Sequence, residues 1–406
     1  DMDASSDVME TKIPRYVSDI TINWLETVLG YSFDCHVVVH KVHKQNAVGP
    51  GDNFLTIVTR VSVDATVGGI RQDVSLIIKT AAEARKARML LEVMSGFERE
   101  CYVYREFLPY IGRNFNNHCF PLHYYGRQSG DVGVLVLEDL TSRGFTMRNK
   151  KECITLAEAR SALVTLAKLH AQGHVLTSED RFTFEVDLRR VETPIMKEFE
   201  KDCAKFIQSI IMNEFPELDI YVESIRHVFN RQSHLHFYYK HPKPGKFETI
   251  IHGDAWSNNM MFRYHEGSDP EVKLIDWQMT RKSSSVSDIA YFLYSSADTA
   301  FRARYSDHLL KLYLKTYTGE IKRYKPICEQ DYSFEEIKQQ YEDLKEYGFI
   351  IALTFARLIH DEVAENSLPI NSDDNTDLGY DKSLSGYFKP ILLEFIGNGL
   401  LYRGDN

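Results

Sequence analysis

The 406-residue sequence has no apolar run of about 18 residues, so it predicts no membrane-spanning helix. Its six cysteines lie far apart and form no C-x-x-C pair, which argues against a disulfide scaffold and a zinc site. The N-terminal segment DMDASSDVMETK lacks the basic and apolar stretches of a signal or transit peptide. N-x-S/T sites are absent as well. These absences favour a reduced, cytoplasmic location.

Positive charge is also in short supply, because the formal net charge is −10. A surface of that sign does not favour a phosphate backbone, so nucleic acid is not an expected partner. A small anionic ligand held in a local pocket remains compatible with it. We expect a monomer.

Strand patterns are concentrated in the first third of the chain. Residues 54–63 alternate apolar and polar side chains, 73–79 follow a turn at VGGIRQ, and 132–140 are apolar almost throughout. Between them, 83–109 carry apolar residues at steps of three and four, which predicts a helix. We expect residues 1–140 to form a small antiparallel sheet with one helix.

Helical patterns dominate residues 141–406. One helix begins with a capping box formed by Thr155 and Glu158, and 193–230 and 334–365 also have helical periodicity. A hairpin interrupts them, with NMMF and VKLID as strands on either side of a polar turn. The expected fold class is α+β, with a smaller sheet-containing N-terminal lobe and a larger helical C-terminal lobe.

The segment IIHGDAWSNNMMF at 250–262 concentrates polar side chains between apolar ends. Asp254 and Asn259 lie in an H-x-D-x-x-x-x-N pattern that leads into the hairpin, and Asp276 ends the returning strand. A hairpin brings its two ends together, so we expect Asn259 and Asp276 to lie close to each other. Their amide and carboxylate oxygens are ligands suited to Mg²⁺. Asp254 is then free to accept or orient a hydroxyl proton, as phosphoryl transfer requires. The alternative is that these are ordinary polar loop residues.

Two charged residues of the first lobe have inward-facing positions. Lys79 ends the strand VSLIIK, and Glu100 lies on the apolar stripe of the following helix. An inward carboxylate needs a cation, and a Lys–Glu pair positions ATP phosphates in kinases. A solvated lysine and a surface glutamate are the simpler interpretation of each residue alone, and Glu98 competes for the pairing.

Two further segments are candidates for nucleotide contacts. In NAVGPGDNF, Gly49 and Gly51 permit a tight turn close to phosphate, with Asp52 and Asn53 beside them. This is not a G-x-G-x-x-G motif, and an ordinary hairpin turn is the alternative. In VLVLEDL, backbone groups of Leu137, Glu138 and Asp139 are placed to bond an adenine edge, or else simply continue a buried strand.

His252 and Asp288 are expected to support the segment 252–259, called the catalytic segment below, rather than to react. Asp254 already suits the role of base, so His252 is interpreted as structural. Asp288 opens the apolar helix SVSDIAYFLYSS and is either an N-terminal cap or a group that holds the loop around His252.

Taken in order, GPGDNF, LIIK, FERECYVYREFLP, VLVLEDL, LAKLHA, IIHGDAWSNNMMF, LIDWQ and SDIAYFL resemble the ecdysteroid kinase-like family. That family is related to choline kinases and aminoglycoside phosphotransferases. The resemblance implies a two-lobed protein-kinase-like fold and ATP- and Mg²⁺-dependent phosphorylation of a hydroxyl on a small molecule, a steroid hormone in the family's namesakes. It implies that Asp254 is the base and that Asn259 and Asp276 bind Mg²⁺. It also implies that Lys79, paired with Glu100, contacts the phosphates. Trp277 and Gln278 replace the Phe-Gly of the commonest kinase pattern.

Several functions compete with a steroid kinase. Only residues 277–287 separate Asp276 from Asp288 and no A-P-E follows, which leaves no room for the activation loop of a protein kinase. A catalytically silent binder of a hydrophobic ligand would be expected to have lost the lysine, the base or a metal ligand. A kinase for a xenobiotic, plant-derived or choline-like alcohol stays open. The aromatic stretches HLHFYYKHP at 234–242 and GYFKP at 386–390 favour an apolar acceptor pocket.

Overall fold

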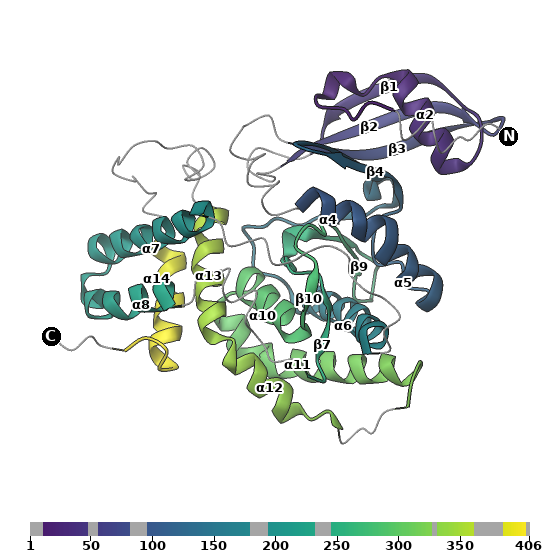
Figure 1. The fold of residues 1–406 in the computed structure, drawn as a ribbon. Coiled ribbons are helices and arrows are strands. Elements are labelled where there is room, and N and C mark those ends of the chain that lie inside the picture. The colour runs from purple at the N-terminus through teal and green to yellow at the C-terminus, as the bar shows by residue number, and fades with distance from the viewer. Residues whose placement is uncertain are drawn as a thin grey trace. The chain divides into compact units, whose positions relative to one another are not determined.

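The computed structural model describes residues 11–47, 56–81, 96–178, 194–231, 245–326, 331–360 and 385–402 (Figure 1). The chain divides into two compact units. The first contains Asp1–Thr146 and Lys273–Met279, and the second contains Met147–Val272 and Thr280–Asn406. The sequence places the division near residue 140, and the excursion of 273–279 into the first unit has no signal in the sequence. Among the described residues, no helix is both long and apolar enough to cross a membrane.

An antiparallel sheet forms the body of the first unit. Within the described residues it has five strands in the order β1-β2-β3-β5-β4. The strands are β1 (Val37–Asn46), β2 (Thr56–Val67), β3 (Ile70–Ala81), β4 (His123–Ser129) and β5 (Val132–Glu138). β2 and β3 are joined at Gly68 and Gly69, both of which have positive φ, the conformation that a two-residue hairpin turn needs. Lys79 of β3 lies between Val58 of β2 and Leu135 of β5.

Helices cover both faces of this sheet, so the expectation of a single helix was wrong. The short η1 (Val17–Asp19) and α2 (Ile22–Phe33) come first, and α2 buries Leu25, Val28 and Leu29 in the same core as Leu76 and Ile78 of β3. Neighbouring residues of a strand point to opposite faces, so Lys79 points away from α2. α4 (Gly96–Tyr102) packs on β4 and β5.

The helix expected over 83–109 can be compared with the structure only from Gly96 onward, and there the helical segment extends past 109. Residues 82–95 lie outside the described part of the chain. Beyond α4 the chain makes a π-helical turn, η2 (Val103–Phe107), and continues as α5 (Leu108–Phe115). Pro109 has no N–H to donate to the preceding turn, and a π-turn is one way in which a continuous helix accommodates that loss.

The second unit is mainly helical, and together with the sheet of the first unit it confirms the α+β fold class. α6 (Leu156–Ser178) begins with the expected capping box, because Thr155 and Glu158 exchange hydrogen bonds through their side chains and backbone N–H groups. α6 packs against β7 and α11, and the approach to β7 requires glycine, since a Cβ on Gly173 would lie 2.6 Å from Thr249 Oγ1. The other described helices of this unit are α7 (Pro194–Glu214), α8 (Val222–Arg231), α10 (Ser285–Ser296), α11 (Thr299–Lys322), α12 (Phe334–Asp343), α13 (Lys345–His360) and α14 (Ser385–Gly397). It also contains the 3₁₀ turns η4 (Pro216–Tyr221) and η5 (Ser257–Asn259). A further 3₁₀ turn, η3 (Leu140–Arg143), belongs to the first unit.

Two helices that the sequence predicts as continuous are each divided. The pattern at 193–230 becomes α7 and α8, separated by Phe215 and η4, which begins at Pro216, where proline cannot continue the hydrogen-bond ladder. The pattern at 334–365 becomes α12 and α13, separated at Leu344, and 361–365 lie outside the described residues.

The expected hairpin is present as β8 (Met260–Arg263) and β9 (Glu271–Leu274), neighbours in a sheet with β6 (Thr146–Met147). β7 (Glu248–Ile251) and β10 (Arg281–Ser284) form a separate antiparallel pair. Along the chain, β7 comes before the catalytic segment and β10 comes after it.

His123 of β4 is expected to make the protein sensitive to acid. Burial, helped by the positive charge of Arg105, lowers the pKa of His123 from its usual 6.5 to about 4. As the pH falls below 6.5, the unfolded chain gains a proton at this ring and the folded chain does not, so stability is lost between pH 6.5 and pH 4. We expect His123→Phe, which keeps a ring to stack on Tyr104, to remove roughly 1–2 kcal/mol of the stability difference between pH 7 and pH 5.

Urea unfolding of the wild type and the variant at both pH values measures this effect. His43→Phe, at an exposed position of β1, should retain the wild-type pH dependence. Equal slopes for His123→Phe and the wild type would contradict the explanation.

Candidate active site

A buried ion pair joins the sheet and α4 of the first unit. Lys79 Nζ lies 2.9 Å from Glu100 Oε1 and 2.8 Å from Glu100 Oε2, and both residues are almost fully buried. Lys79 is brought there by strand alternation, and Glu100 by its place on the buried stripe of α4. Glu98, the competing carboxylate, is exposed.

Asp276 lies in the same cluster. Its Oδ2 is 3.4 Å from Lys79 Nζ, and the backbone N–H of Trp277 donates to Glu100 Oε1 at 3.2 Å. Arg99 of α4 donates to the carbonyl oxygen of Gln278 at 2.6 Å. Asp276 has φ of 65°, a left-handed conformation that is rare outside glycine and is found at functional sites. Glu100 and Arg99 of α4 therefore bind the backbone of Trp277 and Gln278, the two residues that follow Asp276.

The electrostatics of the cluster keep the lysine charged. Burial alone would lower the pKa of Lys79, but the carboxylates of Asp276 and Glu100 outweigh burial and raise it. Burial raises the pKa of Glu100 to about 7, and the charge of Asp276 adds to this effect while Lys79 opposes it. Two carboxyl groups thus lie against one ammonium group, which stays charged.

Asp276 has the properties of a metal ligand. Among the described residues, its Oδ1 is buried and has no hydrogen-bond partner. A buried carboxylate oxygen without a donor suits a hard cation such as Mg²⁺. No group of three or more His, Cys, Asp or Glu side chains in the described ranges could hold a metal. Mg²⁺ bound beside a nucleotide needs only one or two protein carboxylates, because phosphates supply further ligands.

In the second unit, Asp254 and Asn259 form a pair. The Asn259 amide Nδ2 donates to Asp254 Oδ2 at 2.8 Å and to the Asp254 carbonyl oxygen at 2.9 Å. The amide oxygen of Asn259 is the atom left to act as a ligand. Asp276 belongs to the first unit and this pair to the second, so a shared Mg²⁺ site stays a prediction.

Asp288 of α10 anchors the backbone of the catalytic segment. Its carboxylate accepts the N–H of His252 at 2.8 Å and of Gly253 at 2.9 Å, and it accepts a further hydrogen bond from His170 Nε2 at 3.1 Å. Burial opposes ionisation of Asp288, but the hydrogen bond from His170 and the neighbouring charges prevail and lower its pKa. The cap of α10 is Ser284, so Asp288 is not the N-terminal cap. Gly253 has φ of 85°, which favours glycine at this position.

His252 is fully buried and makes local contacts. Its Nδ1 accepts the N–H of Asp254 at 3.3 Å, and its carbonyl oxygen accepts from Thr280 Oγ1 at 3.4 Å. These contacts shape the turn that carries Asp254.

The segment 137–139 is largely occupied by contacts within the first unit. The N–H of Glu138 donates to Leu122 O, and the N–H of Asp139 donates to Ser75 O. The Asp139 carboxylate accepts from Arg60 and Ser75, and its other oxygen caps η3. The N–H groups of Glu138 and Asp139 are thus already paired within the first unit. A contact between other backbone groups of 137–139 and an adenine edge stays a prediction. Gly49, Gly51, Asp52 and Asn53 lie outside the described residues.

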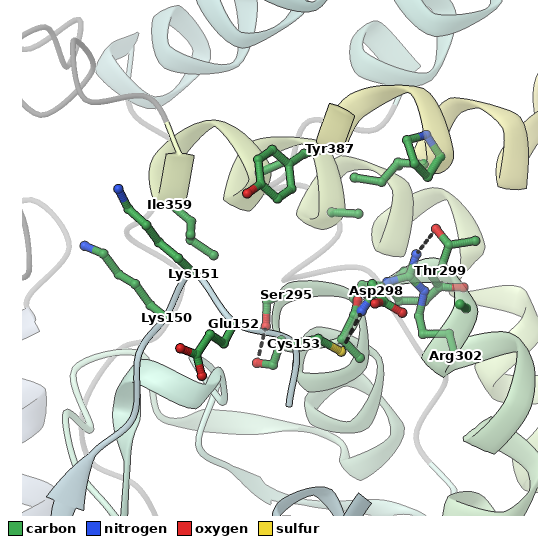
Figure 2. Close-up of a pocket in the computed structure, with 18 of the residues that line it drawn as sticks. Lys150, Lys151, Glu152, Cys153, Ser295, Asp298, Thr299, Arg302, Ile359 and Tyr387 are labelled. Carbon is green, nitrogen blue, oxygen red and sulfur yellow. Dashed lines mark hydrogen bonds between the residues drawn. The ribbon is translucent and has the colours of Figure 1, made fainter. Parts of the chain in front are cut away.

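A cavity of about 430 Å³ lies in the second unit (Figure 2). Its walls are residues 150–153, the C-terminal end of α10, the N-terminal end of α11, and faces of α13 and α14. Gly386, Tyr387 and Pro390, from the aromatic stretch singled out in the sequence, form part of the α14 wall. Ser296, another lining residue, accepts the N–H of Ser257 in the catalytic segment at 2.9 Å. The cavity and the catalytic segment thus share structural support. The stretch 234–242 lies outside the described residues.

The sequence did not predict one contact to Asp254. The hydroxyl of Tyr291 donates to Asp254 Oδ1 at 2.5 Å. In SVSDIAYFLYSS, Tyr291 reads as one more apolar core residue of a buried helix. Its spacing of three from Asp288 was the available signal, since residues three apart share a helix face.

Comparison with known proteins places this geometry in a family. The model described as "Ecdysteroid kinase-like family" matches residues 50–325. A 4-hydroxytryptamine kinase from Psilocybe cyanescens is 32% identical over 82 residues, which is 18% of this chain and 22% of that protein. The matched part of the chain therefore spans less than a quarter of that relative.

Solved structures of similar fold include two kinases of small alcohols. Choline kinase from Cryptosporidium parvum Iowa II has a TM-score of 0.46 and 14% identity, with 89% of this chain and 91% of that chain covered. Plasmodium vivax ethanolamine kinase has a TM-score of 0.41 and 12% identity, with 89% and 83% covered.

Proposed function

Because the chain belongs to the ecdysteroid kinase-like family, we propose that it transfers the γ-phosphoryl group of ATP to a hydroxyl of a small hydrophobic molecule, an ecdysteroid or related steroid. The observation that carries the proposal is the buried cluster of Lys79, Glu100 and Asp276, in which a lysine and an unpartnered carboxylate oxygen lie together. Such a cluster costs free energy to bury, and buried charges of this kind gather at functional sites.

In the proposed reaction, Asp254 accepts the proton of the acceptor hydroxyl. The hydroxyl oxygen attacks the γ-phosphorus, the bond from that phosphorus to the bridging oxygen breaks, and ADP leaves. Lys79 binds phosphate oxygens and is oriented by Glu100. Asp276 and Asn259 are the residues that would hold Mg²⁺, which neutralises charge on the phosphates when bound. Support for these roles comes from the matching spacing in the sequence and from the contacts within each unit.

The cavity beside α10 is the proposed acceptor pocket. It belongs to the same unit as Asp254, and Ser296 in its wall also holds the backbone of the catalytic segment. Its volume of about 430 Å³ is within the range of roughly 300–1,000 Å³ found for drug-sized ligands. That size favours a steroid over a choline-sized alcohol.

A variant of the pocket wall tests this assignment. Tyr387 on α14 lines the cavity and is partly exposed, so its removal should leave the fold intact. We expect Tyr387→Ala to raise the KM for the acceptor roughly ten- to hundredfold, because a bound apolar ligand loses an aromatic contact. The KM for ATP should not change. Tyr402→Ala removes another exposed tyrosine, one outside the cavity, and serves as the control. An unchanged acceptor KM in Tyr387→Ala would place the acceptor elsewhere.

The acceptor itself is identified by a panel of alcohols. The protein is incubated with ATP, Mg²⁺ and, in separate arms, an ecdysteroid, other hydroxylated steroids, plant-derived and xenobiotic alcohols, choline, ethanolamine and 4-hydroxytryptamine. Phosphorylation is read from the mass of each alcohol. We expect the steroid arms to react fastest. Transfer only to another alcohol would replace the steroid assignment, and transfer to none would favour a silent ligand binder.

A further inference from the structure

We propose that Tyr291 is a positioning residue for this reaction, whose hydroxyl fixes the orientation of the Asp254 carboxylate. The inference rests on the proposed function, in which Asp254 is the base. It adds a residue that the kinase pattern of lysine, base and metal ligands does not contain.

Both oxygens of the Asp254 carboxylate are held by side chains. Tyr291 donates its hydroxyl to Oδ1 at 2.5 Å, and Asn259 donates Nδ2 to Oδ2 at 2.8 Å. Two donors on opposite oxygens prevent rotation about the Cβ–Cγ bond, which has a broad, roughly two-fold preference in a free aspartate. A base in a fixed orientation presents the same lone pair to each acceptor hydroxyl. Without the Tyr291 hydroxyl, the hydrogen bond to Oδ1 would be lost while the one from Asn259 to Oδ2 remained.

Packing in turn fixes the position of Tyr291. The residue is only 4% exposed. Its ring lies edge-on to Phe355 of α13, with centroids 5.5 Å apart, and against Tyr347 at 6.2 Å. α13 approaches α10 closely because Gly348 has no side chain, and a Cβ there would lie 2.3 Å from the ring of Tyr294. The ring of Tyr291 is therefore clamped independently of its hydroxyl.

Side chains of α10 hold the catalytic segment along its length. Asp288 binds the N–H groups of His252 and Gly253, Tyr291 binds the side chain of Asp254, and Ser296 binds the N–H of Ser257. Two of these contacts set the path of the backbone. Of the contacts named here, that of Tyr291 reaches the reacting carboxylate, so it is the one expected to affect turnover directly.

The phenylalanine variant separates the hydroxyl from the ring. Tyr291→Phe retains the packing against Phe355 and Tyr347 and removes the hydrogen bond. We expect kcat to fall roughly tenfold to hundredfold, the effect of losing one hydrogen bond to a charged group, with the KM values for ATP and acceptor within about threefold of wild type. The Asp254 carboxylate should be rotated in a crystal structure of the variant.

Tyr317→Phe is the matched control. It removes another buried hydroxyl of the same unit, which donates to Lys246 O at 3.0 Å, and it should leave kcat unchanged. A kcat for Tyr291→Phe within about twofold of wild type, with Asp254 in its original orientation, would overturn the proposal. A rise in KM equal to the fall in kcat/KM would overturn it too, since that pattern indicates binding rather than positioning. If the wild type transfers phosphate to no acceptor, the proposed function fails, and the orientation of Asp254 in the two crystal structures still tests the hold of Tyr291.

Discussion

Replacing Asp254 by asparagine is expected to lower kcat for acceptor phosphorylation by a factor of roughly 10²–10⁴, the usual contribution of a general base. An amide cannot take the hydroxyl proton, although it has almost the same shape as the carboxylate. It also retains an oxygen that can accept from Tyr291 or Asn259. The fold and the KM for ATP should therefore remain close to wild type. Initial rates at saturating ATP and acceptor measure the effect.

Asp269→Asn provides the control for this substitution. Asp269 is exposed in the same unit and pairs with Arg160 at 3.1 Å. Its loss should leave kcat unchanged. If Asp254→Asn turned over within about tenfold of wild type, the smallest effect expected of a base would be missing and Asp254 would not be the base.

Replacing Lys79 by methionine is expected to reduce the free energy of unfolding by about 3–5 kcal/mol, because it leaves buried carboxylates without their cation. Glu100 is nearly inaccessible to solvent, and Asp276 is largely buried beside it. The same substitution removes the proposed contact with the ATP phosphates, so activity should be lost as well. Urea unfolding measures the first effect and acceptor phosphorylation the second.

A double variant separates stability from function at this site. In Lys79→Met with Glu100→Gln, one uncompensated charge is gone, so we expect a substantial part of the lost stability to return while activity remains absent. Lys338→Met breaks an exposed pair with Asp307 and should cost no more than about 1 kcal/mol. Recovery of turnover in the double variant would show that Lys79 has only a structural role. A loss below about 1 kcal/mol in Lys79→Met would show that the pair behaves like a surface pair.

Periodicity was sufficient to predict the neighbours of Lys79. Strand alternation determines which face the lysine occupies, and helical spacing puts Glu100 on the inward face of α4. Both rules are local, and the two elements pack against each other. The capping box at Thr155 and the β8–β9 hairpin are local features of the same kind, and both are present in the structure.

Features that depend on distant partners were missed. β1 reads VVVHKVHKQN, with exposed Lys and His residues that conceal its strand character, and it lies at the edge of the sheet, where such residues discourage aggregation. The N–H groups of Glu138 and Asp139 are paired with Leu122 and Ser75, residues remote in sequence, so the sequence could not show that they are unavailable.

Tyr291 illustrates the limit within the candidate site. A tyrosine in an apolar helix is usually a core residue, and packing does place its ring there. Its hydroxyl contacts Asp254 only because Asp288, one turn earlier, fixes the catalytic segment against the same helix. The chemistry of the helix therefore depends on a tertiary contact that periodicity does not encode.

The most direct measurement is phosphoryl transfer from ATP whose γ-phosphate carries heavy oxygen. The protein is incubated with this ATP, Mg²⁺ and an ecdysteroid, and the steroid is analysed by mass. We expect a phosphorylated steroid that carries the label, one ADP formed for each product, and no product with Asp254→Asn. Binding of ATP and steroid without labelled product, in wild type as in the variant, would contradict the assignment of this chain as a small-molecule kinase acting on steroids.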